Sequence, residues 1–143
     1  MTSPARDINQ LLSGTLGLIG GTNLFYGQLP EENIARGIPH QCVALYDTGG
    51  VFANPRWDRD EINLQIIIRS ALDDYDSGYN LAYSIKNSLL GRETVTINGS
   101  LYSQFVLEGD INALGFDTSG RARFTLRFRI VRENFTGSSR EDF

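Results

Sequence analysis

The arginines of the last regular segment are the residues with the clearest chemical potential in this chain. Residues 121–132 alternate between apolar and polar side chains, as in a β-strand whose two faces have different surroundings. One side is apolar and belongs in a core. The other side carries the guanidiniums of Arg121, Arg123, Arg127 and Arg129. Like charges on one strand face repel, so this ladder requires acidic partners in its own sheet, on another subunit, or contact with water.

Three interpretations of this arginine face stay open from the residues alone. The arginines can be solvated on the open side of an antiparallel sheet, since such faces are normally polar. They can pair with acidic residues of a neighbouring subunit, or a few of them can line a path for DNA. The formal net charge of -4 and the pI near 4.9 make nucleic-acid contact the weakest of the three.

A second candidate for chemistry is the triplet Asp47-Thr48-Gly49, which follows apolar residues. It resembles the active-site triplet of retroviral-type aspartic proteases, in which each of two chains supplies one Asp. Residues 89–93 resemble the second signature of that family, but a helix is expected before Gly91 and a hairpin after it. We therefore favour a turn that ends a strand, with Asp47 bound to nearby backbone amides, and keep a dimeric aspartic protease using Asp47 as an alternative.

The remaining reactive residue types do not form a recognisable site. His40 and Cys42 are the only residues of their kinds, and a metal centre built on them lacks further ligands. The carboxylates of Asp73, Asp74 and Asp76 are better explained as the start of a helix than as a cation site. We predict no catalytic residue, no bound metal and no cofactor.

Length and composition predict one domain with a core of its own. The chain has 143 residues, of which 41% are hydrophobic and 21% charged. Its single cysteine excludes an internal disulfide, and no apolar run approaches the roughly 20 residues of a membrane helix. We therefore expect no contact with a membrane.

The elements that position these residues follow from periodicity and capping signals. Asp73-Asp74 should begin the second helix and Gly91 should end it, while Asn98-Gly99 predicts a tight hairpin. Residues 108–120 are expected to form a loop. Helices are expected at 4 to about 18 and at 75–90, and strands at 24–29, 41–46, 61–69, 94–97, 101–107 and 121–132. This order predicts an α+β fold in which two helices pack on a mixed, mainly antiparallel β-sheet, with a single domain at 1–132 and a polar, flexible tail at 133–143.

Taken in this order, the elements resemble the minor capsid proteins of tailed bacteriophages that act as tail terminators. The resemblance rests on the run Val43–Gly50, on the strand from Ile62 to Arg69, and on the tyrosine-rich helix that follows it. It continues through Leu114-Gly115-Phe116-Asp117 and Gly120-Arg121 into the final strand. It spans residues 5–132, and the order and spacing of the pieces carry it.

The resemblance implies a structural virion protein and no enzyme. Its relatives form a hexameric ring that caps the tail tube, stops tube polymerisation and joins the tail to the head connector. The implied partners are other copies of the chain, the tail tube protein and the connector or stopper proteins. DNA passes through the ring without sequence-specific binding. The implied location is the head-tail junction of the virion, after assembly in the host cytoplasm.

Within such a ring, one patch of each subunit meets a different patch of the next. We expect the arginine face to form one half of this contact. Acidic residues at Asp58, Asp60 and Glu61, or at Asp73 and Asp74, are the candidates for the other half. A head-completion or stopper protein of the connector is the alternative within the same functional class.

Overall fold

One mixed sheet of seven strands forms the centre of the structure, whose computed structural model describes residues 2–51 and 59–133. β1 pairs with β2 in parallel and every other pairing is antiparallel. β5 and β6 both pair with β7, each along a different part of its length. The strands, in the order of the sheet, are β1 (Leu24–Tyr26), β2 (Cys42–Gly50), β3 (Arg59–Leu72), β7 (Arg121–Glu133), β5 (Ser100–Leu107) and β4 (Thr94–Ile97), with β6 (Asn112–Phe116) beside β7.

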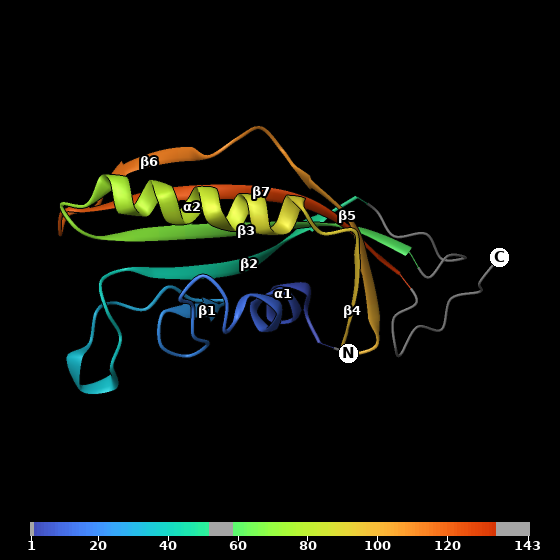
Figure 1. Cartoon of the computed structure of the whole chain (residues 1–143), viewed down its shortest axis with the longest axis horizontal. Coiled ribbons are helices and arrows are strands. Elements are labelled where there is room, and N and C mark those ends of the chain that lie inside the picture. Colours follow the sequence, from blue (N-terminus) through green and yellow to red (C-terminus); the bar gives the residue numbers. More distant parts are fainter. Residues whose placement is uncertain (1, 52–58, 134–143) are drawn as a thin grey trace.

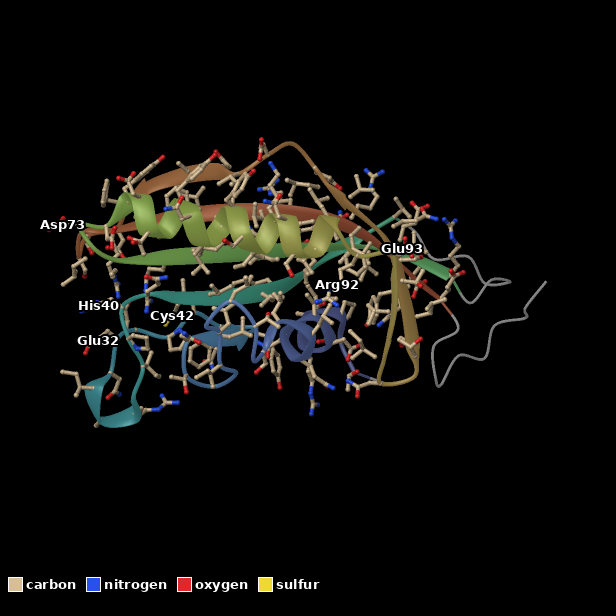
Figure 2. All side chains as sticks on the ribbon, viewed as in Figure 1. Glu32, His40, Cys42, Asp73, Arg92 and Glu93 are labelled. Carbon is tan, nitrogen blue, oxygen red and sulfur yellow. The ribbon has the colours of Figure 1, made fainter. Side chains whose placement is uncertain are left out.

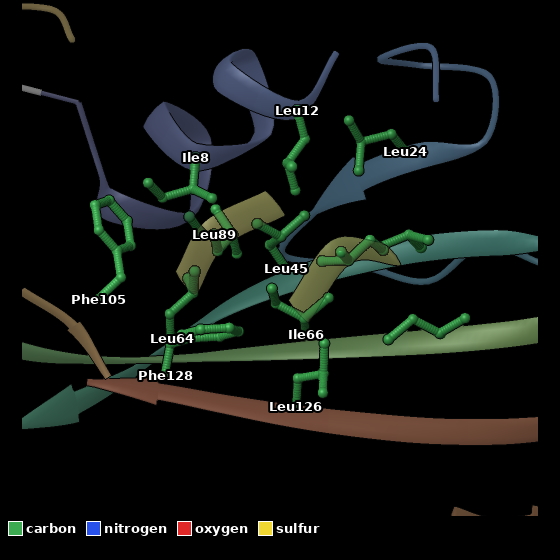
Figure 3. Close-up of a cluster of buried hydrophobic side chains, with 14 of the residues drawn as sticks. Ile8, Leu12, Leu24, Leu45, Leu64, Ile66, Leu89, Phe105, Leu126 and Phe128 are labelled. Atoms are coloured by element: carbon green, nitrogen blue, oxygen red, sulfur yellow. The ribbon is translucent and has the colours of Figure 1, made fainter. Parts of the chain in front are cut away.

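Two helices, α1 (Pro4–Leu12) and α2 (Tyr75–Leu90), contribute to one core on a single face of this sheet (Figures 1 and 3). Alternate residues of β3 and β7 point toward the helices, as the sequence predicts. The predicted apolar side of β7 is fully buried, and its members are Ala122, Phe124, Leu126, Phe128 and Ile130. The α+β prediction is therefore confirmed. Among the described residues, the other side of the sheet carries no α-helix, and we call it the open face.

The second helix has the predicted ends. The Asp74 carboxylate accepts a hydrogen bond from the backbone N–H of Ser77 at 3.2 Å, and the helix stops before Gly91. Gly78 lets the helix approach the sheet closely, because a Cβ at this position would lie 2.8 Å from the ring of Phe124.

The first helix is shorter than predicted. Ser3 caps it by accepting a hydrogen bond from the backbone N–H of Arg6, but it ends at Leu12, whereas we expected it to reach residue 18. Gly14, Leu16 and Gly17 all have positive φ, which an α-helix cannot contain. The apolar spacing continues past Leu12, although the backbone no longer follows it.

A buried carboxylate fixes this helix against the β4–β5 hairpin. Asp7 is fully buried and accepts hydrogen bonds from the hydroxyl of Tyr102 and from the amide of Asn98. Burial, followed by the bond to Asp7, raises the pKa of the Tyr102 hydroxyl, which stays protonated as the donor. Asn98 and Gly99 both have positive φ, so the predicted tight hairpin turn is confirmed.

The Asp47–Gly50 segment is not the predicted turn, because β2 continues through it. Asp47 pairs with Leu64 and Gly50 with Ile62, with an irregularity in between. Gly50 has φ +148, and a Cβ there would lie 2.1 Å from the carbonyl oxygen of Glu61. A glycine at this position therefore lets β2 extend past the irregularity.

Four further strands differ from the predictions, and one predicted segment falls outside the described chain. β3 (Arg59–Leu72) extends beyond the predicted 61–69 at both ends. β1 ends at Tyr26, short of the predicted residue 29, because Gly27 has positive φ. β6 lies within the expected loop, and β7 includes Glu133. The predicted tail beyond Glu133 lies outside the described residues.

Candidate interaction surfaces

The predicted arginine ladder divides into a buried half and an exposed half. Arg121 is only 3% exposed, and its guanidinium donates to Asp117 at 2.9 Å and to Glu31 at 2.8 Å. Arg123 is half-buried and lies opposite Arg69 in the β3–β7 register. Arg121 is thus bound within its own chain, and this end of the ladder is part of the fold.

Arg127 and Arg129 remain exposed on the open face. Arg129 forms a loose ion pair with Glu108 at 3.4 Å, and the Arg127 guanidinium has no ion pair or hydrogen bond among residues 2–51 and 59–133. Two hollows meet at Arg127 and Glu108, with volumes of about 410 and 280 Å³. The remaining residues lining them are mostly polar: Thr48, Asn63, Gln65, Gly109, Asp110, Ile111, Asn112 and Thr125. This is a surface suited to polar contacts with a carboxylate partner.

The predicted acidic residues have contacts of their own. Asp60 lies 3.4 Å from Arg132, and Glu61 lies 3.7 Å from Arg59. Asp74 is the cap of α2, while Asp73 is exposed beside it. Asp58 lies outside the described residues. A contact between these acids and the arginines of another copy stays a prediction.

Sequence reasoning missed Arg69, which turns out to be an anchor. Arg69 is 2% exposed, and its guanidinium donates to the carbonyl oxygens of His40 at 2.6 Å, Pro30 at 2.8 Å and Pro39 at 3.3 Å. Burial, and then the neighbouring charge of Arg121, lowers the pKa of this guanidinium. The only sequence signal was an arginine at the end of a strand, because the acceptors are backbone groups.

Residues 31–38, which we call the arm, lie between these carbonyl groups. The arm contains the 3-10 helix η1 (Ile34–Arg36) and projects away from the sheet at the lower left of Figure 1. Asn33 and Ile38 exchange two backbone hydrogen bonds of 2.9 Å, and the side chain of Asn33 caps η1. Ile38 is buried near the sheet, whereas Ile34 is 89% exposed. Arg69 and Arg121 thus hold the base of a structured projection with an apolar residue at its tip.

A pocket of about 260 Å³ lies between the segment after α1 and the start of β2. None of the described residues that line it is charged. Leu16 on its wall is 44% exposed and has φ 54, a conformation that is uncommon for residues other than glycine. The residues lining the pocket are Leu16, Gly17, Leu18, Asn23, Pro39, Gln41, Cys42 and Leu81.

An aromatic stripe runs along one side of α2, where Tyr75 and Tyr79 also contact the buried ring of Phe124. Tyr75, Tyr79 and Tyr83 are all exposed and recur every fourth residue. Exposed Phe116 of β6 lies beside Tyr75, with 6.3 Å between the ring centroids. All residues of β6 are exposed, and its only strand partner in the described chain is β7. This corner of the molecule offers apolar surface next to a strand edge, which proteins usually protect or cover.

Asp47 makes a structural contact that differs from the predicted one. The Asp47 carboxylate accepts a hydrogen bond from the backbone N–H of Ala5 at 2.9 Å, in the first turn of α1. We expected it to bind nearby amides, but its partner is 42 positions away along the chain. The carboxylate therefore caps a helix, where the helix dipole favours negative charge.

His40 and Cys42 lie where the chain passes from the arm into β2 (Figure 2). The Cys42 thiol is buried and donates to the carbonyl of Pro39, while the carbonyl of His40 binds Arg69. Burial raises the pKa of this thiol, so it stays protonated. In the described parts of the chain, no three His, Cys, Asp or Glu side chains are grouped to hold a metal, and no helix has the length and apolar character to cross a membrane.

A sequence model of the bacteriophage tail terminator protein family matches residues 8–134. Because this match covers most of the chain, the protein belongs to that family, a group of structural phage proteins. It is thus a component of the phage tail and interacts with other tail components. No curated protein and no solved structure gives a significant match.

Proposed function

We propose that six copies of this protein form a ring that caps the tail tube, ends its polymerisation and joins the tail to the head connector. The observation that carries the proposal is the family match over residues 8–134. The number six comes from the family resemblance. DNA passes through the ring without sequence-specific binding, and the ring is assembled in the host cytoplasm and located at the head-tail junction of the virion.

The distribution of surfaces supports a role in assembly. The helix face of the sheet is buried in the core, whereas the open face, the arm and the tyrosine side of α2 are available to partners. Arg127 and Arg129 are the exposed cations of the open face, next to two polar hollows. A protein that sits between a tube and a connector needs several separate surfaces, and this chain offers them.

The open face supports a contact through paired charges. We propose that Arg127 and Arg129 meet acidic residues of the next subunit, with Asp60, Glu61, Asp73 and the neighbouring Asp74 as the candidates. Such contacts are directional because a guanidinium binds a carboxylate through two parallel hydrogen bonds. A head-completion or stopper protein would use similar contacts, but it would bind the connector and leave tube length unchanged.

Two measurements on the isolated protein and on virions test the proposal. Native mass spectrometry is expected to give six times the mass of one chain, 15.9 kDa. Gold-labelled antibody is expected to mark the junction of head and tail. A stable monomer under all conditions, or label distributed along the tail tube, would contradict the proposed ring.

A further inference from the structure

We propose that the arm of one copy docks into the pocket beside Leu16 of the next copy, with Ile34 as the inserted side chain. This inference rests on the proposed ring and specifies one of its contacts. It joins three features that the fold leaves unexplained: an exposed isoleucine, an open pocket and a leucine held in a left-handed conformation.

The first step is that the arm is built to present its tip. Ile34 is 89% exposed, yet the segment that carries it is held by the paired backbone bonds of Asn33 and Ile38. Its base is tied to the sheet by Arg69 and Arg121. A side chain presented on an ordered projection loses little conformational entropy on binding, so its burial contributes more to affinity.

The second step is that the same chain carries a matching pocket. An apolar cavity of about 150 Å³ can hold a benzene molecule. The pocket of about 260 Å³ can therefore accept a four-carbon side chain. Leu16, Leu18 and Leu81 supply the apolar part of the wall, and Asn23 and Gln41 supply neutral polar groups. None of the described lining residues is charged, which favours an apolar tip over a charged one.

The third step concerns Leu16. A non-glycine residue with φ 54 costs free energy, of the order of 1 kcal/mol, relative to the ordinary regions. In this conformation Leu16 lies at the wall of the pocket with 44% of its surface exposed. A ligand that covers Leu16 would bury that apolar surface and account for the arrangement.

The fourth step identifies the occupant as a second copy. The arm does not fill the pocket of its own chain, since Ile34 is exposed. Projection and pocket are different patches of one molecule, and contacts of this kind form a ring when the rotation between successive copies closes, as the proposed ring requires. Because both halves are present in this chain, no other protein is needed to supply either of them.

Disulfide trapping tests the contact. We expect a mixture of Ile34→Cys and Leu16→Cys proteins to give a crosslinked dimer under mild oxidation, and neither variant alone to do so. The wild-type chain, whose Cys42 is buried, is the background control. A mixture that crosslinks no better than wild type would overturn the proposal, as would Ile34→Cys protein that crosslinks to itself.

A second variant pair separates this contact from the ring as a whole. Because Ile34 is exposed, Ile34→Asp should fold with an unchanged melting temperature but self-associate at least about 30-fold more weakly, as at an interface hot spot. Ile34→Leu keeps an apolar tip and should assemble as wild type does. Wild-type protein that never forms rings would contradict the proposed function itself. If the wild-type protein forms rings and Ile34→Asp forms the same rings, the arm contact alone would be overturned. The same conclusion would follow if the Ile34→Asp rings lost only their binding to the tube.

Discussion

The guanidinium of Arg121 donates a hydrogen bond to the carboxylate of Glu31 over 2.8 Å, across 90 positions of sequence. This bond connects the first residue of the last strand to the arm. Arg69 reinforces the connection from β3 by binding carbonyl oxygens at both ends of the same loop. Two arginines on the polar sides of their strands therefore hold a projection in place.

Replacing Arg69 should destabilise the protein and loosen the arm. Arg69→Ala removes three hydrogen bonds and leaves carbonyl groups unsatisfied, so we expect a loss of about 3 kcal/mol in the free energy of unfolding. Arg69→Lys should lose less unfolding free energy than Arg69→Ala, but an ammonium group cannot reproduce the planar set of N–H donors of the guanidinium. Urea denaturation measures both changes. Gln65→Ala, on the same strand face with one bond to Thr125, is the control and should lose about 1 kcal/mol. Equal losses for Arg69→Ala and Gln65→Ala would contradict the anchoring role.

Asp47 should contribute to stability and have no role in cleavage. Asp47→Ala removes the cap at Ala5 and should lower the free energy of unfolding by about 1 kcal/mol. Asp47→Asn keeps an acceptor oxygen and loses only the charge near the helix dipole, which should lower it by about 0.5 kcal/mol. Chemical denaturation compares the two variants. A peptide-cleavage assay of the wild type should show no activity, and activity that disappears in Asp47→Asn would restore the protease interpretation.

The contact of Asp117 with Arg121 should make stability depend on pH in the acid range. Partial burial opposes ionisation of Asp117, but hydrogen bonds from the backbone and guanidinium of Arg121 and from Ser119 outweigh it and hold the pKa below the ordinary 3.8. The folded state therefore gains stability above this pKa and loses it as the pH falls through the lowered value. In urea denaturation, Asp117→Asn should be less stable than wild type at about pH 6, and the difference should shrink at about pH 3. A difference that stays constant with pH would show that the charge on Asp117 contributes nothing.

Reversing the charge of the exposed arginines should weaken the ring. In Arg127→Glu/Arg129→Glu, carboxylates replace guanidiniums at the proposed contact, so self-association should fall at least about tenfold and depend less on salt. Arg6→Glu/Arg92→Glu changes the net charge equally at sites away from this face and should assemble as wild type does. Native mass spectrometry and sedimentation at two salt concentrations measure the effect. An unchanged hexamer in the Arg127/Arg129 variant would refute the pairing.

The sequence predicts this fold best where local patterns and tertiary packing agree. The strict alternation of β7 and the caps of α2 are local signals, and both elements have the expected positions. β6 has no such signal, because Gly115 and an irregularity interrupt its alternation and its strand conformation depends on pairing with β7. The end of α1 was misplaced for a related reason, since apolar spacing continues where positive φ values stop the helix.

The candidate surfaces were predictable only in part. The alternation of β7 identifies the arginine side of the strand. It does not indicate that Arg121 is buried and hydrogen-bonded to Glu31 and Asp117. The arm could not be predicted as a projection, because Arg69 holds it through backbone oxygens that have no signature in the sequence. Side-chain type alone does not indicate which of several arginines a fold will bury.

The length of tails made without this protein tests the central claim most directly. Electron microscopy of lysates from a phage that lacks it should show tubes of variable length, many longer than wild type, with no heads attached. Wild-type protein supplied in trans should restore tails of uniform length joined to heads. Tails of normal length joined to heads in the absence of the protein would contradict its role as the cap of the tail tube.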